Sequence, residues 1–159
     1  MSKQVKIGND VYKEEMIEDF VEIDGGPRLK IKGLKVLRCK ETDDILMDMA
    51  TGIQRDQKVI AWLLKRYSDL KIPGKIGNHI RRLVGVTASE WADLAGIDPS
   101  ALSHAAQRNS ILDRYSAFVL VCLAMDFVTG GKQGRALIEK TKKIGEEFEM
   151  AEAEAVEVE

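Results

Sequence analysis

Apolar and charged positions alternate on both sides of an Asp-Gly-Gly-Pro turn sequence at residues 24–27. Apolar residues stand at positions 20, 21 and 23 before the turn, and at 29, 31, 34, 36 and 37 after it. Two such runs around a glycine-rich turn predict a β-hairpin. Gly33, inside the second run, indicates a β-bulge. From about Thr51 to Tyr67 the spacing becomes that of an amphipathic helix.

Beyond Pro73-Gly74 the chain has helical spacing throughout. The first helix of this block is expected to place four apolar residues on one face: Ile76, Ile80, Leu83 and Val84. Thr87 and Glu90 then form a capping box, which predicts a second helix to about Ala95. Gly96 permits a sharp turn, and Asp98-Pro99 supplies the cap and first residue of a third helix.

Asp113 can cap a fourth helix that extends to about Phe127. Nine consecutive apolar residues, 117–125, lie within it, and a helix of this kind is buried on every side in a core or an oligomer interface. This is too much apolar surface for one small core, so we expect a homodimer through about residues 113–148. A last helix is expected from 134 to about 150, followed by a disordered acidic tail.

These elements predict an α+β protein in three parts. A small N-terminal β-hairpin and helix unit is expected over residues 1–72, an all-α helix-turn-helix domain over 75–129, and a C-terminal helix with an acidic tail over 130–159. The hairpin unit is expected to have a small apolar core made of Phe20, Ile23, Leu29, Ile31, Val36 and Ile45.

Charge is unevenly distributed along the 159 residues, although the net charge is only −2. Seven glutamates and no basic residue follow position 145, so the rest of the chain is mildly basic, which suggests contact with nucleic acid. No apolar run reaches the roughly 20 residues of a membrane span, and no secretory signal is recognisable. With only two distant cysteines, we expect a reduced, cytoplasmic protein with no membrane association.

Three residues have the spacing that a helix-turn-helix motif requires. Ala92 is small enough for two helices to cross closely, Gly96 permits the turn, and Leu102 can pack back from the second helix. Capping signals stand before and within this triplet, and helices flank it. The combination predicts a helix-turn-helix fold in which the third helix of the block enters the major groove of DNA.

The stretch IGNHIRRLVGVTASEWADLAGIDPSALSHAAQRNS, residues 76–110, resembles the helix-turn-helix domains of lambda-repressor and Cro. More narrowly, residues 10–128 are similar to the MqsA-type (YgiT-like) antitoxins. That resemblance implies an N-terminal zinc-binding hairpin domain, a linker helix, and a C-terminal domain that dimerises and binds DNA. It also implies an antitoxin that represses its own operon and binds a toxin, here through the N-terminal unit.

Two departures from that family change the expectations. The family carries two Cys-x-x-Cys pairs, whereas this chain offers only Cys39 in the corresponding region. One thiolate cannot hold a tetrahedral zinc ion, so we expect no metal and no cofactor. In the third helix, His104 stands where the family has a base-reading arginine.

The helix-turn-helix motif and the resemblance together predict the DNA contacts. Base contacts are expected from Ser100, Ala101 and His104. Phosphate contacts are expected from Thr87, Ser89, Ser103, Gln107, Arg108 and Asn109, because hydroxyl, amide and guanidinium groups donate to phosphate oxygens.

The sequence offers little support for catalysis. Neither histidine has a nucleophile or acid at useful local spacing, and no glycine-rich phosphate loop follows a strand, so we expect no enzyme. Two alternatives remain open. One is a helix-turn-helix scaffold used as a protein-interaction module without DNA binding, and the other is a mobile-element repressor without a toxin partner.

Overall fold

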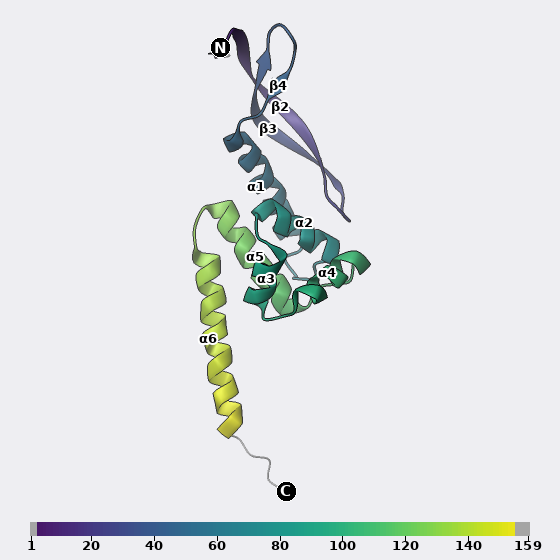
Figure 1. The fold of residues 1–159 in the computed structure, drawn as a ribbon, viewed down its shortest axis with the longest axis vertical. Helices are drawn as coiled ribbons and strands as arrows, with labels where there is room; N and C mark the ends of the chain where they lie inside the picture. The colour runs from purple at the N-terminus through teal and green to yellow at the C-terminus, as the bar shows by residue number, and fades with distance from the viewer. Residues whose placement is uncertain (1–2, 155–159) are drawn as a thin grey trace. The chain divides into compact units, whose positions relative to one another are not determined.

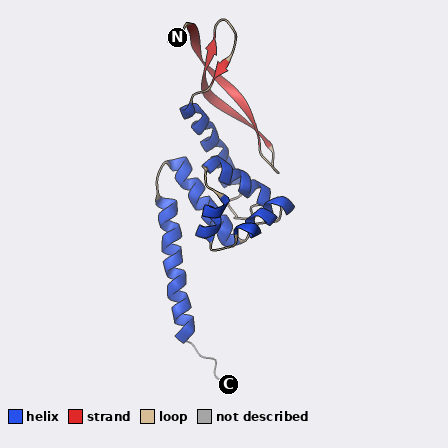
Figure 2. Ribbon diagram, viewed as in Figure 1, coloured by secondary structure: helices blue, strands red, loops and turns tan. Residues whose placement is uncertain are grey.

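The computed structural model describes residues 3–154, with side chains to residue 147 (Figure 1). The chain divides into two compact units, Met1–Arg66 and Tyr67–Glu159. The fold class is α+β, as predicted, with the strands confined to the first unit (Figure 2). The division falls after residue 66 and not after 72, and the segment from residue 130 onward belongs to the second unit.

The first unit contains a four-stranded antiparallel sheet in the order β1-β2-β3-β4. Its strands are β1 (Gln4–Ile7), β2 (Asp10–Glu22), β3 (Arg28–Cys39) and β4 (Ile45–Leu46). The predicted hairpin is confirmed as β2 and β3, joined through Gly25 at a φ of 75°. The two short outer strands were not predicted, because four or two residues carry too little periodicity to be recognised.

The predicted bulge at Gly33 is confirmed, and it decides which residues form the core. The pairing of β2 with β3 shifts between Ile17 and Asp19, opposite Gly33, whose φ is 74°. An extra residue reverses the alternation of side chains along a strand. Four apolar residues of β3 on both sides of the bulge are therefore buried together: Leu29, Ile31, Leu34 and Val36.

Helix α1 (Met49–Arg66) completes this core with Val59, Ile60 and Leu63, all fully buried. Its side chains also bind the free edge of β3: Thr51 donates to the carbonyl of Lys35 at 2.8 Å, and Lys58 donates to that of Lys32 at 2.8 Å. Such bonds satisfy an edge strand that would otherwise be open to pairing.

Two of the residues expected in the hairpin core are not there. Phe20 is 51% exposed and Ile45 is 45% exposed. Phe20 pairs with Lys30 across the sheet, away from the buried positions of β3, and the Arg28 guanidinium lies 4.5 Å from its ring centre. Phe20 faces the opposite side because adjacent residues of a strand point to opposite faces, and its neighbour Val21 pairs with the buried Leu29.

The second unit is helical in its described part, with α2 (Gly74–Val84), α3 (Ala88–Ala95), α4 (Pro99–Arg108), α5 (Arg114–Thr129) and α6 (Gln133–Glu154). The predicted N-caps are confirmed: the side chains of Thr87, Asp98 and Asp113 accept from the backbone N–H groups of Glu90, Ser100 and Ser116. Local side-chain chemistry therefore sets where three helices begin.

The reciprocal half of the predicted capping box is wrong. Instead of turning back to Thr87, the Glu90 carboxylate accepts from the Arg135 guanidinium of α6 at 3.0 Å. A charged partner on a neighbouring helix competes with the local backbone amide for the same carboxylate.

The apolar stretch of α5 is buried within the single chain, so the argument that it needs a second copy is wrong. Six of its nine residues are buried: Ala117, Val119, Leu120, Cys122, Leu123 and Ala124. Helices α2, α3 and α6 all contact α5 (Figure 1). Met125, in contrast, is 45% exposed.

Helix α6 runs back along α5, and Gly134 of α6 lies against the backbone of Cys122. It continues through residues 151–154, although we expected a disordered tail from 151 onward. Residues 155–159 of that tail lie outside the described residues.

Candidate nucleic-acid interface

The three residues of the predicted motif hold α3 and α4 together as expected. Ala92 is fully buried, which permits close approach of the two helices. Gly96 ends α3 at a φ of 70°, a conformation that suits glycine, and Ile97 donates to the Ala92 carbonyl at 3.0 Å. Leu102, 5% exposed, packs back from α4. These contacts define a helix-turn-helix arrangement.

The chain on either side of the motif fixes α4 against α2. Leu112 donates to the Ile72 carbonyl at 2.9 Å, and Gly74 donates to the Ser110 carbonyl at 2.7 Å. Gly74 is buried directly against the backbone of Ala105. These backbone contacts hold α4 in a fixed position, so the side chains on its exposed face are well placed for binding.

The structure brings most of the predicted contact residues to the exposed side of α4. The exposed residues are Ser100, Ala101, Ser103, His104, Gln107 and Arg108. Ser100 and His104 are four residues apart on the helix, so both side chains project from neighbouring positions of one face. No carboxylate in the described part of the chain lies within ion-pair distance of Arg108, which leaves its guanidinium available to a phosphate.

Ser100 can read a base only as an acceptor in this arrangement. Its hydroxyl donates to Asp98 Oδ1 at 3.0 Å, and its backbone N–H donates to the same oxygen at 2.9 Å. The remaining capacity of the hydroxyl oxygen is its lone pairs. It therefore fits an amino group on cytosine or adenine in the major groove.

The pKa of Asp98 is lowered, chiefly because its carboxylate accepts the Ser100 backbone N–H. A hydrogen bond from the Ser100 hydroxyl lowers it further, burial raises it by a smaller amount, and the interaction with His104 contributes the smallest lowering. A carboxylate at the first turn of α4 thus stabilises the helix and places negative charge near any phosphate that approaches it.

Replacing Asp98 by asparagine tests both effects. Asparagine caps a helix but does not titrate. Since the folded pKa is below the unfolded value, the charged cap stabilises the protein at neutral pH. That advantage of the wild type over Asp98→Asn should vanish as the pH falls below about 4. Urea midpoints of both proteins between pH 7 and 2 measure it, and a constant difference would contradict it. If α4 lies against DNA, the variant should bind a duplex of any sequence more tightly at pH 7, because a negative charge near the phosphates is removed.

Two of the predicted phosphate-contacting residues, Thr87 and Asn109, also make hydrogen bonds that stabilise the fold. The Thr87 hydroxyl oxygen caps α3 by accepting from Glu90 at 3.0 Å. Asn109 ends α4 at a φ of 51°, and its side-chain oxygen accepts from the Lys75 backbone at 3.2 Å. Both keep a donor, the hydroxyl proton or the amide NH₂, for a phosphate. Ser89 is exposed in the first turn of α3.

Arg81 is not among the predicted contact residues, but the structure places it beside them. This half-buried arginine of α2 lines a pocket together with Ser103 and Gln107 of α4. Its position in the helix before the motif offers no local signal, because only the packing of α2 against α4 brings it to the surface that α4 presents.

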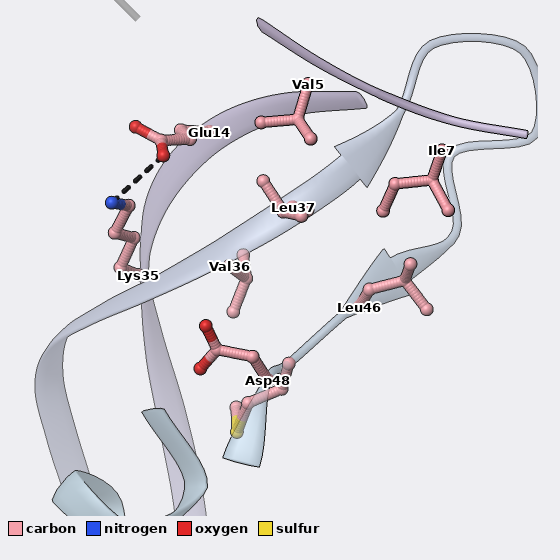
Figure 3. Close-up of a pocket in the computed structure, with 9 residues that line it drawn as sticks. Val5, Ile7, Glu14, Lys35, Val36, Leu37, Leu46 and Asp48 are labelled. Atoms are coloured by element: carbon pink, nitrogen blue, oxygen red, sulfur yellow. Dashed lines mark ion pairs between the residues drawn. The ribbon is translucent and has the colours of Figure 1, made fainter. Parts of the chain in front are cut away.

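The N-terminal unit contains a separate groove of about 460 Å³. Its walls are mainly apolar, with Val5, Ile7 and Leu46 around Leu37 of β3 (Figure 3). The Glu14–Lys35 ion pair, with 2.9 Å between the charged atoms, closes one end. The sequence could not predict this groove, because β1 and β4 form two of its walls.

Among residues 3–147, whose side chains the structure describes, no group of three or more His, Cys, Asp or Glu residues is placed to hold a metal ion. Cys39 is buried. The pKa of its thiol is lowered, first by a hydrogen bond with the Thr42 side chain.

Comparisons with models of protein families, with curated proteins and with solved structures each return no match. Within the described residues, no helix has the length and apolar character needed to cross a membrane.

Proposed function

We propose that the protein is a sequence-specific DNA-binding transcriptional regulator, a repressor that places α4 in the major groove. The observation that carries this proposal is the exposed face of α4, where polar side chains project from the second helix of a buttressed helix-turn-helix. Helix-turn-helix proteins read base edges from this position.

His104 and Ser100 are assigned to bases, with Ala101 between them as an apolar contact. A neutral imidazole makes one hydrogen bond at a base edge, whereas arginine makes two to guanine. Discrimination at this base pair should therefore be weaker than an arginine contact would provide. Arg108, Ser103, Gln107 and Ser89 are assigned to phosphates, with the remaining donors of Thr87 and Asn109.

A homodimer is part of the proposal, and the exposed side of α6 supports it. Leu137 and Ile144 are 44% and 42% exposed, and they stand seven residues apart on one side of the helix. Helices that pack against a partner helix place apolar residues at this seven-residue spacing. A symmetric dimer would read two half-sites about 34–36 Å apart.

Replacing His104 and Arg108 separately by alanine tests the assignments. The best operator is first selected from a randomised duplex pool. His104→Ala should then lower affinity for that operator about five- to thirtyfold, equivalent to 1–2 kcal/mol, and affinity for a shuffled duplex much less. Arg108→Ala should weaken both duplexes alike and lower the salt slope by about one. Equal effects of His104→Ala on both duplexes would remove it from the base readers.

The antitoxin role is the more specific proposal, and it rests on the family resemblance. The apolar groove of the N-terminal unit supports it as a surface with room for a protein partner. The alternative of a protein-interaction module is favoured by Ala105 and Ala106 in α4 and by the presence of only one arginine and no lysine in that helix. A salt titration separates the two, because only DNA binding should weaken steeply through counterion release.

A further inference from the structure

A pocket of about 300 Å³ lies where α2, α3 and α4 meet. Its apolar floor includes Trp91 and Leu102, which are 2% and 5% exposed. Its polar lining consists of Asn78 and Arg81 from α2 and of Ser103 and Gln107 from α4. An apolar floor under polar groups strengthens any electrostatic interaction made there, because the local dielectric is lower than in water.

The Arg81 guanidinium is half-buried beside this pocket and is bonded to neutral oxygens. Nε and Nη2 both donate to Asn78 Oδ1, at 3.0 and 2.8 Å, and Nη1 donates to the Val86 carbonyl at 2.9 Å. No carboxylate in the described part of the chain lies within ion-pair distance of it. Its pKa is lowered, first by burial and then by the charge of Arg82. Because its hydrogen-bond partners are neutral oxygens, the positive charge of the guanidinium is not balanced by a nearby carboxylate.

Donors without a committed acceptor converge on the same pocket. Arginine has five N–H donors, and the three bonds above leave two of them. Ser103 and Gln107 contribute an exposed hydroxyl and amide. Ala88, the first residue of α3, also lines the pocket, and the N–H groups of a first helical turn have no intrahelical acceptor. Such a set of donors fits a tetrahedral oxyanion.

We infer that this pocket binds one phosphate group, held by Arg81, Ser103 and Gln107. Its source in DNA is a backbone phosphate beside the groove that α4 enters, and this identification of the source rests on the proposed function. Asn78 is a positioning residue. Its side-chain oxygen accepts from Nε and Nη2 of Arg81 and so fixes the orientation of the guanidinium, which directs the remaining N–H groups at the phosphate.

The first arm of the test uses inorganic phosphate and no DNA. The ¹H–¹⁵N spectrum of the full chain is titrated with phosphate against chloride at equal ionic strength. We expect saturable shifts confined to the Arg81 Nε–H and the amides of Ala88, Ser103 and Gln107. Uniform or non-saturating shifts would overturn the phosphate pocket, whatever the protein does with DNA.

The second arm neutralises Arg81 without removing it. Asn78→Asp has the same shape and gives the guanidinium a carboxylate partner, so the bond to Val86 and the fold should persist. Gln133→Glu, at the exposed start of α6, adds the same charge outside the pocket. Asn78→Asp should abolish the phosphate shifts, while Gln133→Glu leaves them intact.

DNA binding by the same variants identifies the source of the phosphate. Asn78→Asp should lower affinity for every duplex about fivefold or more at 0.15 M salt and reduce the salt slope by about one, because one phosphate contact is lost. Suppose that the wild type shows the phosphate shifts but that Asn78→Asp binds DNA as tightly as the wild type. The pocket would then bind a free anion, and its assignment to a DNA backbone phosphate would be overturned. A wild type that takes phosphate but binds no duplex would instead overturn the proposed function.

Discussion

Replacing Gly74 by alanine is expected to lower the free energy of unfolding of the helical unit by about 3 kcal/mol. Gly74 is the buried first residue of α2, and a methyl group there would collide with the backbone carbonyl of Ala105 in α4. The Ala106 backbone nitrogen would lie only 2.8 Å away. Backbone atoms cannot swing aside as a side chain can, so α2 and α4 must separate.

The separation should also displace the exposed face of α4, because the Gly74 N–H donates to the carbonyl of Ser110, two residues after the end of α4. Gly145→Ala is the matched control. No heavy atom lies within 4 Å of its added methyl group, so it should raise stability by up to about 1 kcal/mol through helix propensity. Urea unfolding of both variants measures the effect. A Gly74→Ala protein as stable as the wild type would mean that α2 does not pack on α4 in this way.

Replacing both Leu137 and Ile144 by lysine is expected to convert the proposed dimer to a monomer. Both side chains are more than two-fifths exposed in the single chain, so the fold should survive the change. In a dimer interface, however, two unpaired charges would be buried at high cost. Because the second half-site is then no longer bound intramolecularly, affinity for a two-site operator should fall at least about a hundredfold.

The matched control for this variant is Ala136→Lys, an exposed position on another side of α6. It should leave both the mass in solution and the affinity unchanged. Light scattering after gel filtration gives the mass, and the operator titration gives the affinity. A double variant that stays dimeric would place the interface away from this stripe, and a wild type that is monomeric at operator-binding concentrations would overturn the dimer itself.

The sequence by itself determined where most of the predicted helices begin and end. Thr87, Asp98 and Asp113 act on N–H groups two or three residues away, and the glycine at position 96 needs only its own backbone freedom. Such interactions are contained within about four residues, so the local sequence is sufficient to specify them. The helix-turn-helix motif was predictable for the same reason, since its three residues lie in one short segment.

Only the tertiary structure decided which surfaces are covered. The register shift at Gly33 determined which residues of β3 are buried. Packing of neighbouring helices, α6 among them, covered the apolar stretch of α5 that had suggested a second copy of the chain. The Glu90 carboxylate accepts from Arg135 of α6 and not from its local backbone partner. Packing of α2 against α4 likewise brought Arg81 to the pocket beside Ser103 and Gln107. Each outcome depends on residues far apart in the chain, and hydrophobic periodicity does not encode which distant element will cover a given face.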